Sequence, residues 1–510
     1  RLRKQFAERG LTTPSDRAIA AAPLLPGRLR THASCVQEIA ILRRVALSSA
    51  HIRAQQVHGN CAATMLPILL TTAFATRAPS LLYVDAVGPE PREFIQNLEE
   101  RGVDVYRVFS RPFIAGVEQK GAPDEELDAL MSLRAPSADD DVPTWASLLL
   151  DGDDADVLGV MCASDAGLAT AERLQHALVE RRSNGVEPAR RDKYLMHEAV
   201  RAAGLAAAAQ AVARDAADLE AFVATRPRPL ELIVKPRRGQ ASVRVGRASS
   251  EAQARHMLGM LLEEAVSLDD ESVPGAPTAL LQECLAGDEW AVDTVSRDGE
   301  HKCVALWRYD KGEANGAPFV NFSDELMAVA GEREESLVRY VFGCLDALGW
   351  RWGPCHVEVK LTPDRGPVLV EVNAGRPNGV DFRLICDACI GYNQYDVCAD
   401  LYLTGGALFE ELPTMPPPTL AAAGRLVKLV CAASGVLGGV NFEEAIGALP
   451  SLVRFEVERE EGDHIDATVD LASCAGYAHL VHPDADAVER DYRALRALQD
   501  EGLFEVSLGE

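Results

Sequence analysis

The sequence predicts a protein of mixed architecture, α/β in its first part and α+β in its later part, and three observations support this prediction. Patterns typical of strand, helix and strand follow one another over residues 80–108, which is the order of a parallel βαβ unit. Residues 356–360 and 368–373 alternate apolar and polar side chains around a turn with proline and glycine, which indicates an antiparallel hairpin. The length of 510 residues corresponds to roughly two to four domains.

Composition and charge narrow the classes of function. The net charge of −26 argues against nucleic acid or an anionic membrane surface as the main partner. No apolar run approaches the ~18 residues of a membrane span. The 12 cysteines are scattered, mostly within apolar segments, so we expect reduced, buried thiols and a cytoplasmic protein. Cys386 and Cys389 form a lone C-x-x-C without the further ligands that a structural zinc site requires.

Residues 1–57 form a basic N-terminal extension. They contain ten Lys or Arg and three Asp or Glu, which gives a net charge of 10 − 3 = +7. This composition fits a transit segment for an organelle. It also fits an irregular basic extension or an extra helix around residues 36–47, and we favour this second interpretation. Because the chain starts at Arg1 and not at methionine, we expect a fragment or a processed form.

Residues 58–188 predict a Rossmann-like N-terminal domain. A helix is expected over 63–75, and an acidic, loose segment over 136–143. No G-x-G-x-x-G follows any of the predicted strands, so we expect no dinucleotide site in this domain. The predicted strands cover residues 80–85, 103–108 and 156–161, and the predicted helices cover 90–101 and 166–181.

The next segment places a lysine where it can meet phosphate. Helices over 189–203 and 218–225 lead to a strand over 230–236. Lys235 stands at the end of this strand, before a loop of small residues and a return strand over 243–246. Backbone N–H groups and an ammonium group in such a turn can hold phosphates, although an ordinary hairpin is the alternative.

Residues 279–348 predict antiparallel strands followed by a helix. Asp298-Gly299 is a good turn dipeptide between the strands predicted over 290–296 and 303–309. Tyr309, Asp310 and Lys311 are expected to end the last strand and to begin a glycine-containing loop. The predicted strands cover 279–284, 290–296 and 303–309, and an amphipathic helix covers 334–348.

The hairpin over 356–373 carries the strongest chemical signal. If Leu361 pairs with Val368, the alternation of side chains places Glu358 opposite Glu371. Two carboxylates at cross-strand distance repel each other, and a cation relieves that repulsion. With the amide oxygen of Asn373 they form an all-oxygen ligand set that suits Mg²⁺ carrying a nucleotide. A solvated strand face with scattered charges is the alternative.

We predict a further small domain over residues 411–510, because the pattern of the sequence changes after the prolines at 416–418. Strands are expected over 420–433 and 452–460, and an amphipathic helix over 484–503. From the residues alone, the simplest interpretation of this domain is an appendage that packs against the rest.

The ordered set of polar residues resembles the ATP-grasp superfamily of carboxylate–amine ligases across roughly residues 58–510. Within that superfamily the chain looks most like the amino-acid (dipeptide) ligase branch with its carnosine-synthase-like members, because residues 381–402 and the C-terminal region fit that branch. The set consists of Lys193, Lys235, the small-residue loop, Gln282-Glu283, Gly287-x-Glu289, Lys311, Glu358 and Glu371-x-Asn373.

This resemblance implies an ATP-grasp domain over residues 189–410, with subdomains over 189–278 and 279–410, and a C-terminal lid over 411–510. It also implies ATP and Mg²⁺ as cofactors, with two Mg²⁺ ions that Mn²⁺ can replace. The nucleotide residues implied are Lys193, Lys235, Gly239 and Ser242 at the phosphates, Gln282, Glu283, Cys284 and Leu285 at the adenine, and Glu289 at the ribose. The implied metal ligands are Glu358, Glu371 and Asn373, and Lys311 and Arg376 are the implied catalytic residues, on the γ-phosphate and the acyl phosphate.

The chemistry implied by the resemblance is an ADP-forming ligation of small molecules, an amino acid or other carboxylate with an amine. The carboxylate takes the γ-phosphoryl group to give an acyl phosphate, and the amine then displaces phosphate. We expect no nucleic acid or membrane partner, and a homodimer is compatible with the family. The alternatives are an ATP-grasp enzyme of another branch, carboxylase-like or of the purine pathway, and a catalytically silent ATP-binding regulatory protein.

Two positions depart from the family pattern. The loop after the predicted phosphate lysine holds one glycine, Gly239, where family loops are richer. Arg376 stands one residue later than the arginine of the family, so Arg383 or Arg425 can take its task instead. His356 beside the predicted metal site is expected to be a hydrogen-bonding neighbour of the ligands, with a metal or base role as the alternative.

Overall fold

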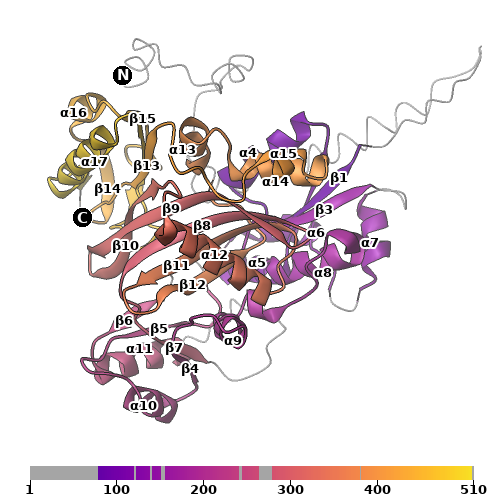
Figure 1. Ribbon diagram of the computed structural model, residues 1–510, viewed down its shortest axis with the longest axis horizontal. Helices are drawn as coiled ribbons and strands as arrows, with labels where there is room; N and C mark the ends of the chain where they lie inside the picture. The colour runs from indigo at the N-terminus through magenta and orange to yellow at the C-terminus, as the bar shows by residue number, and fades with distance from the viewer. Residues whose placement is uncertain are drawn as a thin grey trace, which may run out of the picture. The chain divides into compact units, whose positions relative to one another are not determined.

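Figure 1 shows the computed structural model, which describes residues 78–119, 122–137, 140–150, 156–239, 244–263, 278–379 and 381–507. The basic extension over 1–57 and the helix predicted over 63–75 lie outside the described residues. The described residues divide into an N-terminal unit that ends at Val186 and a C-terminal unit that begins at Glu187.

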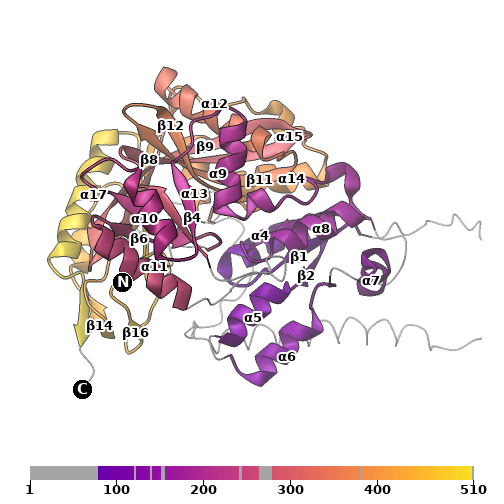
Figure 2. The ribbon, with the colours of Figure 1, turned by 90° about the horizontal axis from the view of Figure 1, so that it is seen from below.

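The N-terminal unit is a parallel sheet with connecting helices, as predicted. Its strands lie in the order β2-β1-β3 and pair in parallel, and α4 links β1 to β2 as the predicted βαβ unit. Helices α5 and α6 pack against each other (Figure 2). The elements are β1 (Ser80–Val84), α4 (Pro89–Glu100), β2 (Asp104–Val108), α5 (Arg111–Gln119), α6 (Asp124–Ser132), α7 (Val142–Leu149), β3 (Val157–Cys162), α8 (Leu168–Leu178) and η1 (Glu180–Arg182).

Helix α7 begins inside the segment predicted to be loose, so the prediction for 136–143 was wrong at its end. Asp141 is the N-cap of this helix, since its carboxylate accepts hydrogen bonds from Thr144 N at 3.4 Å and Thr144 Oγ1 at 2.8 Å. An acidic residue that suggested a loop therefore starts a helix instead.

A buried carboxylate ties together the carboxyl ends of the three parallel strands. Asp85 follows β1, is 2% exposed and has a φ of 55°. It accepts hydrogen bonds from Ser110 N at 2.7 Å and Ser110 Oγ at 2.8 Å, and from Ser164 Oγ at 2.6 Å. A Cβ on Gly167 would lie 2.3 Å from this carboxylate, so only glycine fits there. Burial raises the pKa of Asp85 from its ordinary 3.8 to about 6, although these hydrogen bonds lower it.

The C-terminal unit begins with a small antiparallel sheet in the order β4-β7-β5-β6, against which α10 and α11 pack (Figure 1). The apolar core between them includes Leu219, Phe222, Leu258 and Leu281. The elements are η2 (Pro188–Arg190), α9 (Lys193–Ala202), β4 (Gln210–Ala213), α10 (Ala216–Ala224), β5 (Leu232–Pro236), β6 (Gly246–Ala248), α11 (Glu251–Glu263) and β7 (Ala279–Glu283).

A larger antiparallel sheet follows, in the order β12-β11-β8-β9-β10-β13-β17-β15. Helix α12 packs against β11 and β12, α14 against β8 and β11, and α13 against β13 and β17. The elements up to α15 are β8 (Asp288–Arg297), β9 (Glu300–Ala314), β10 (Ala317–Leu326), α12 (Glu332–Ala347), β11 (Gly353–Thr362), β12 (Gly366–Ala374), α13 (Asp381–Cys389), α14 (Gln394–Leu403) and α15 (Ala407–Glu411).

At two predicted strand boundaries, the true turn lies further along the chain than predicted. Strand β9 continues past Lys311 to Ala314, and the turn comes at Asn315, whose φ is 51°. The polar run that suggested a loop is the end of a long hairpin, which β10 completes. The return strand after Lys235 starts at Gly246, later than predicted, because Arg244 lies in a turn with a φ of 60°.

Three strands from residues 411–510 continue the larger sheet, since β13 pairs with β10 and β17 pairs with both β13 and β15. The same segment forms the sheet β16-β14-β18, and α17 packs on β13 and β17. The elements are β13 (Ala423–Lys428), β14 (Gly435–Val440), α16 (Glu443–Gly447), β15 (Leu452–Val457), β16 (His464–Ile465), β17 (Gly476–His482), α17 (Ala485–Asp500) and β18 (Phe504–Ser507).

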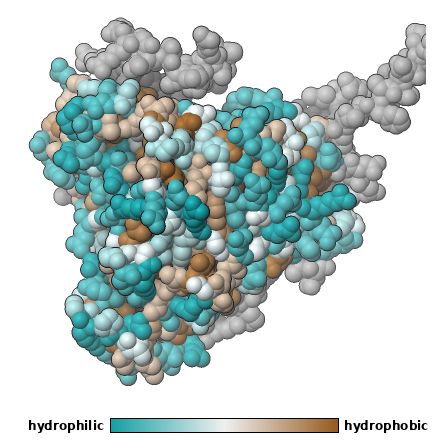
Figure 3. All heavy atoms as spheres, in the orientation of Figure 1, coloured by the Kyte–Doolittle hydropathy of each residue, from teal (hydrophilic) through white to brown (hydrophobic). Residues whose placement is uncertain are grey.

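Hydrophilic residues cover most of the face that Figure 3 shows, with hydrophobic residues scattered between them. None of the helices in the described ranges is both long and apolar enough to cross a bilayer. No disulfide joins the cysteines of these ranges, and their side chains are buried except for that of Cys284, which is partly exposed. The predicted reduced thiols agree with this observation.

Asp85→Asn should remove a pH dependence from the stability of the N-terminal unit. The pKa of Asp85 is raised in the fold, so protonation of Asp85 contributes to the free energy of unfolding. This contribution is fully present below the ordinary pKa of 3.8 and is lost as the pH rises through about 6. Between pH 5 and pH 7.5 we expect the unfolding free energy of the wild type to fall by about 1.4 kcal/mol relative to D85N. Urea unfolding at both pH values measures this change, and a constant difference would contradict the prediction.

Candidate functional site

The hairpin of β11 and β12 brings the two predicted carboxylates together. Glu358 pairs with Glu371 and His356 with Asn373, as predicted. The assumed pairing of Leu361 with Val368 was wrong, because Val368 lies opposite Lys360. A register shift between Glu358 and Val359, at which the partner changes from Glu371 to Leu369, accounts for the difference of one residue.

The neighbouring strands present further charged side chains on the same face. Glu289 of β8 lies opposite Lys360 of β11, so these side chains point to the face that also carries Glu358. Lys311 of β9 lies on this face as well, because it forms an ion pair with Glu289. Alternation along the strand places Lys360 on the face of Glu358, but Lys360 was not among the predicted site residues.

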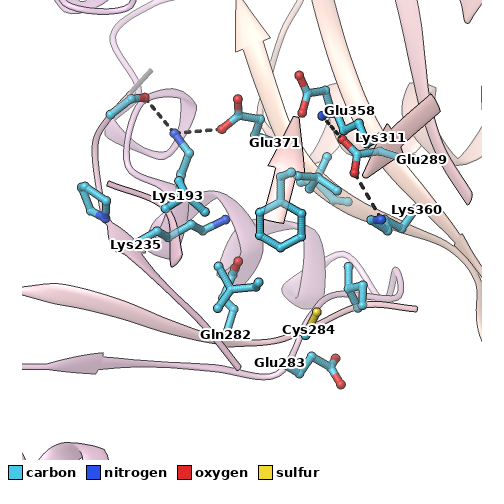
Figure 4. A pocket seen from close by; sticks show the side chains of 18 residues that line it. Lys193, Lys235, Gln282, Glu283, Cys284, Glu289, Lys311, Glu358, Lys360 and Glu371 are labelled. Carbon is cyan, nitrogen blue, oxygen red and sulfur yellow. Dashed lines mark hydrogen bonds and ion pairs between the residues drawn. The ribbon is translucent and has the colours of Figure 1, made fainter. Parts of the chain in front are cut away.

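A pocket forms between this face and the small sheet, within the C-terminal unit (Figure 4). Four lysines and four glutamates line it, together with apolar residues such as Ile233, Phe319 and Leu369. Of the residues predicted for the site, the lining includes Lys193, Lys235, Gly239, Gln282, Glu283, Cys284, Leu285, Glu289, Lys311, Glu358 and Glu371. Asn373 and Arg376 are not among the lining residues, and Ser242 lies outside the described residues.

One end of the pocket holds two lysines beside Glu371. Lys193 Nζ donates a hydrogen bond to Gly239 O at 2.9 Å and lies 2.8 Å from Glu371 Oε2 (Figure 4). Lys235 is 6% exposed, and its ammonium has neither a hydrogen bond nor an ion pair with any described residue. A buried cation without an acceptor is costly, so this end of the pocket is prepared for an anion.

The pKa shifts at this end agree with the geometry. Burial opposes the ionisation of Glu371, but Lys193 and Lys235 outweigh it and lower the pKa of Glu371 to about 2. Burial, together with the nearby Lys193, lowers the pKa of Lys235 from its ordinary 10.5 to about 8. Glu371 is therefore a carboxylate at neutral pH, and Lys235 is an ammonium that is easier to deprotonate than usual.

At the other end, Glu289 accepts from two lysines. Lys311 forms an ion pair with Glu289 Oε1, and Lys360 Nζ lies 3.2 Å from Glu289 Oε2 (Figure 4). Burial alone would lower the pKa of Lys311 and raise that of Glu289, but their mutual attraction reverses both directions. Lys311, predicted to contact a phosphate, is thus held by a carboxylate of the same pocket.

The side chains predicted to face an adenine ring are partly engaged elsewhere. Gln282 Nε2 donates to Gln210 Oε1 at 3.0 Å. Glu283 Oε1 accepts from Arg365 Nη1 at 2.7 Å and from Ala209 N at 2.9 Å. The Glu283 carboxylate therefore connects β7 to Arg365 and Ala209. Contacts with a predicted adenine ring are left to the apolar residues of the lining.

The predicted metal ligands form an oxygen-rich group. Asn373 Nδ2 lies 3.5 Å from Glu371 Oε1, which leaves the amide oxygen of Asn373 available. No group of three or more His, Cys, Asp or Glu in the described ranges could hold a metal ion, so the predicted set has two carboxylates and one amide. An ionised Glu371, Glu358 and an amide oxygen nevertheless fit the preference of Mg²⁺ for oxygen donors.

The comparisons with known proteins agree with this geometry. A family model described as an ATP-grasp domain matches residues 228–382, which contain β5 to β12 of the pocket. The chain therefore contains an ATP-grasp domain over these residues. Dapdiamide A synthase of Enterobacter agglomerans is 26% identical to it over 347 residues, which are 67% of this chain and 79% of that protein. Carnosine synthase 1 of Gallus gallus is 30% identical over 208 residues, but these are 39% of this chain and 21% of that protein.

Solved structures share the fold of this chain. The L-amino acid ligase from Bacillus licheniformis gives a TM-score of 0.62 at 17% identity, over 85% of this chain and 100% of that chain. An N5-carboxyaminoimidazole ribonucleotide synthetase, solved as an ADP complex, gives 0.55 at 15% identity, over 84% of this chain and 99% of that chain. These likenesses confirm the predicted fold class.

His356 of this ATP-grasp domain joins the metal-ligand strand to β8 and β9. Its Nδ1 lies 2.7 Å from Asp293 Oδ1, and its Nε2 lies 2.9 Å from Tyr309 Oη and 3.6 Å from Glu358 Oε1. Burial would lower the pKa of His356, but hydrogen bonds with Asp293 and Glu358 raise it to about 9. His356 thus hydrogen-bonds with Asp293 and Tyr309 and lies beside Glu358, and its role at a metal site stays a prediction. Sequence reasoning missed Asp293, which no motif marks.

Neither alternative to Arg376 is directed at the ATP-grasp pocket. Arg425 forms ion pairs with Glu325 at 2.9 Å and Glu489 at 3.0 Å, and Arg383 lies 3.9 Å from Asp396. None of the three arginines lines the pocket, so the assignment of an acyl-phosphate arginine stays a prediction.

Lys235→Met should stabilise the protein near neutral pH. Because the folded pKa of about 8 lies below the ordinary 10.5, the cost of burying the ammonium is present below pH 8 and is relieved as the pH rises toward 10.5. At pH 7 we expect K235M to raise the unfolding free energy by about 3 kcal/mol, with a smaller gain at pH 10.

The matched control is Lys302→Met. Lys302 Nζ is also buried, but it donates to the carbonyl oxygens of Phe409 and Leu412, so its removal should destabilise the chain. Chemical unfolding of both variants measures the two effects. A destabilised K235M would show that the Lys235 ammonium is compensated within the fold.

Proposed function

We propose that the chain is an ATP- and Mg²⁺-dependent ligase that joins a carboxylate to an amine and forms a dipeptide or a similar amide. The observation that carries this proposal is the Lys235 ammonium, which is buried in the pocket without an acceptor among the described residues. A nucleotide phosphate would supply the missing negative charge. The printed names of the relatives, a dapdiamide synthase, a carnosine synthase and an L-amino acid ligase, support the amide product.

Phosphate would bind at the end of the pocket where Lys193 and Lys235 converge. Lys193 Nζ has three donors, and Gly239 O and Glu371 accept two of them, so the third can reach a phosphate oxygen. Lys235 would contribute its whole ammonium, and phosphate would raise its pKa again by attraction. The apolar side chains of Ile233 and Phe319 would then border the nucleotide base.

Because two lysines contact Glu289, one of them can move to a phosphate while the other stays. When Lys311 turns from Glu289 to the γ-phosphate, Lys360 stays on the other carboxylate oxygen and keeps Glu289 neutralised. Without Lys360, this movement would leave a buried carboxylate unpaired, which is costly. Glu289 would then be free to accept from the ribose hydroxyls through its first oxygen.

Glu358, Glu371 and Asn373 would hold Mg²⁺, which neutralises phosphate oxygens in phosphoryl transfer when it is bound. His356 holds the strand of Glu358 against Asp293 and Tyr309, so the ligand oxygens keep their direction. Glu371 needs no proton loss before it binds a cation, because its pKa is about 2.

The reaction has two steps. A carboxylate oxygen of the first substrate bonds to the γ-phosphorus as the bond to the ADP oxygen breaks, which gives an acyl phosphate. The amine nitrogen then bonds to the acyl carbon, phosphate leaves with the bonding electrons, and the nitrogen loses a proton. Lys193, Lys235 and Lys311 would spread the negative charge that develops on the phosphoryl oxygens. A homodimer, Mn²⁺ in place of Mg²⁺, a cytoplasmic location and a targeting role for residues 1–57 remain predictions.

Phosphate release tests the reaction class directly. With ATP, Mg²⁺ and pooled amino acids, we expect release that depends on the amino acids, followed by new amide masses in the products. Single pairs of amino acids would then identify the substrates. Phosphate release that requires bicarbonate or a nucleotide precursor instead would favour another ATP-grasp branch, and no release with any acceptor would favour a silent ATP-binding protein.

Glu371→Gln should reduce turnover by at least about a hundredfold, because it removes a charged oxygen ligand from the predicted metal set. Thermal unfolding should show a folded protein. Glu313→Gln is the matched control, since its side chain lies on β9 but is 79% exposed and is not part of the pocket lining. Full activity in E371Q would exclude Glu371 from the metal site.

A further inference from the structure

The residues just before α9 hold the start of the loop that follows Lys235. Arg191 Nη1 donates to Gly239 O at 3.3 Å, and Lys193 N donates to Arg237 O at 2.9 Å. Between them, Asp192 Oδ2 lies 2.6 Å from Arg237 Nη2. Asp192 Oδ2 also lies 3.9 Å from Arg238 Nε. We call this group, residues 191–193 with 237–239, the clasp.

Asp192 is the centre of the clasp. It is 1% exposed, and its Oδ1 accepts hydrogen bonds from Tyr194 N at 3.0 Å and Leu195 N at 3.2 Å as the N-cap of α9. Arg237 Nε donates to the same oxygen at 3.3 Å. One buried carboxylate therefore holds the first turn of a helix and a guanidinium from another element at once.

The position of this carboxylate matters for the pocket. Lys193 is the residue after Asp192, and Lys235 stands two residues before Arg237. The two lysines repel each other, yet both line the same end of the pocket. Attraction between Asp192 and Arg237 opposes that repulsion by holding the backbones that carry the lysines.

We propose that Asp192 is a positioning residue for nucleotide binding: it fixes Lys193 and Lys235 at the separation that a chain of phosphates requires. This inference rests on the proposed function, since it needs ATP as the ligand. Asp192 itself touches neither phosphate nor metal in this proposal. Its effect passes through the clasp.

Long-range electrostatics and positioning predict opposite signs, which makes the proposal testable. Asp192→Asn removes a negative charge near an anion site, so electrostatics alone would tighten ATP binding. Positioning predicts weaker binding, because the amide loses the ion pairs with Arg237 and Arg238 while it can still cap α9. The direction of the change in affinity therefore separates the two effects.

The experiment measures dissociation constants for ATP with Mg²⁺, and for ADP, by calorimetry on the full chain. We expect D192N to raise both constants about tenfold, which corresponds to about 1.4 kcal/mol. Asp215→Asn is the matched control, because Asp215 caps α10 by accepting from Ala217 N at 2.9 Å and Asp218 N at 3.0 Å, and it is not part of the pocket lining. D215N should change the constants less than twofold, whatever it does to the melting temperature.

A double variant completes the test. If the clasp acts through one ion pair, D192N with Arg237→Gln should bind ATP no more weakly than the worse of the two single variants. Unchanged or tighter binding by D192N, while Lys235→Met still weakens binding, would overturn the inference and leave the proposed function standing. A wild-type chain that binds neither ATP nor ADP would overturn the proposed function instead.

Discussion

The site depends on where one extra residue falls in the hairpin of β11 and β12. A strand shifted by a single residue turns its side chains to the other face of the sheet. The register shift after Glu358 takes up that residue, so Glu358 and Glu371 stay opposite each other while the remainder of the hairpin continues in its own register. Without this shift, one carboxylate would point toward the apolar side of the sheet that α12 covers, and the charged face would lose a member.

Once the carboxylates share a face, the lysines become necessary. Lys193 compensates Glu371, and Lys311 and Lys360 compensate Glu289, which leaves Lys235 as the buried ammonium without an acceptor among the residues described. Of the four lysines that line the pocket, the other three each have a carboxylate partner. The Lys235 ammonium costs folding free energy, as expected of a binding group that is kept ready for a ligand rather than for the fold.

Much of this arrangement follows from local pattern, and the rest does not for physical reasons. Alternation along a strand predicted which residues share a face, but the pairing of Glu358 with Glu371 was also derived from a Leu361–Val368 pair that the structure does not have. The register shift after Glu358, which the sequence did not reveal, restores the predicted pair. The same alternation puts Lys360 on this face, but its ion pair with Glu289 depends on a neighbouring strand and was not predicted. The extent of β9 beyond Lys311 was not predictable, because exposed strand edges and loops have the same polar composition. Asp293 and Asp192 act through contacts between elements far apart in the chain, and no local motif marks such contacts.

The pairing of β13 with β10 in the larger sheet has a practical consequence for the preparation of shortened chains. Strand β13 lies beside β10, and Asn315, at the turn before β10, donates its side-chain amide to the carbonyl oxygens of Cys431 and Thr468. A shortened chain that stopped before Ala423 would turn β10 into an open edge strand with unpaired backbone groups. Exposed edges of this kind recruit other strands, so such a chain would aggregate rather than yield an isolated nucleotide-binding core.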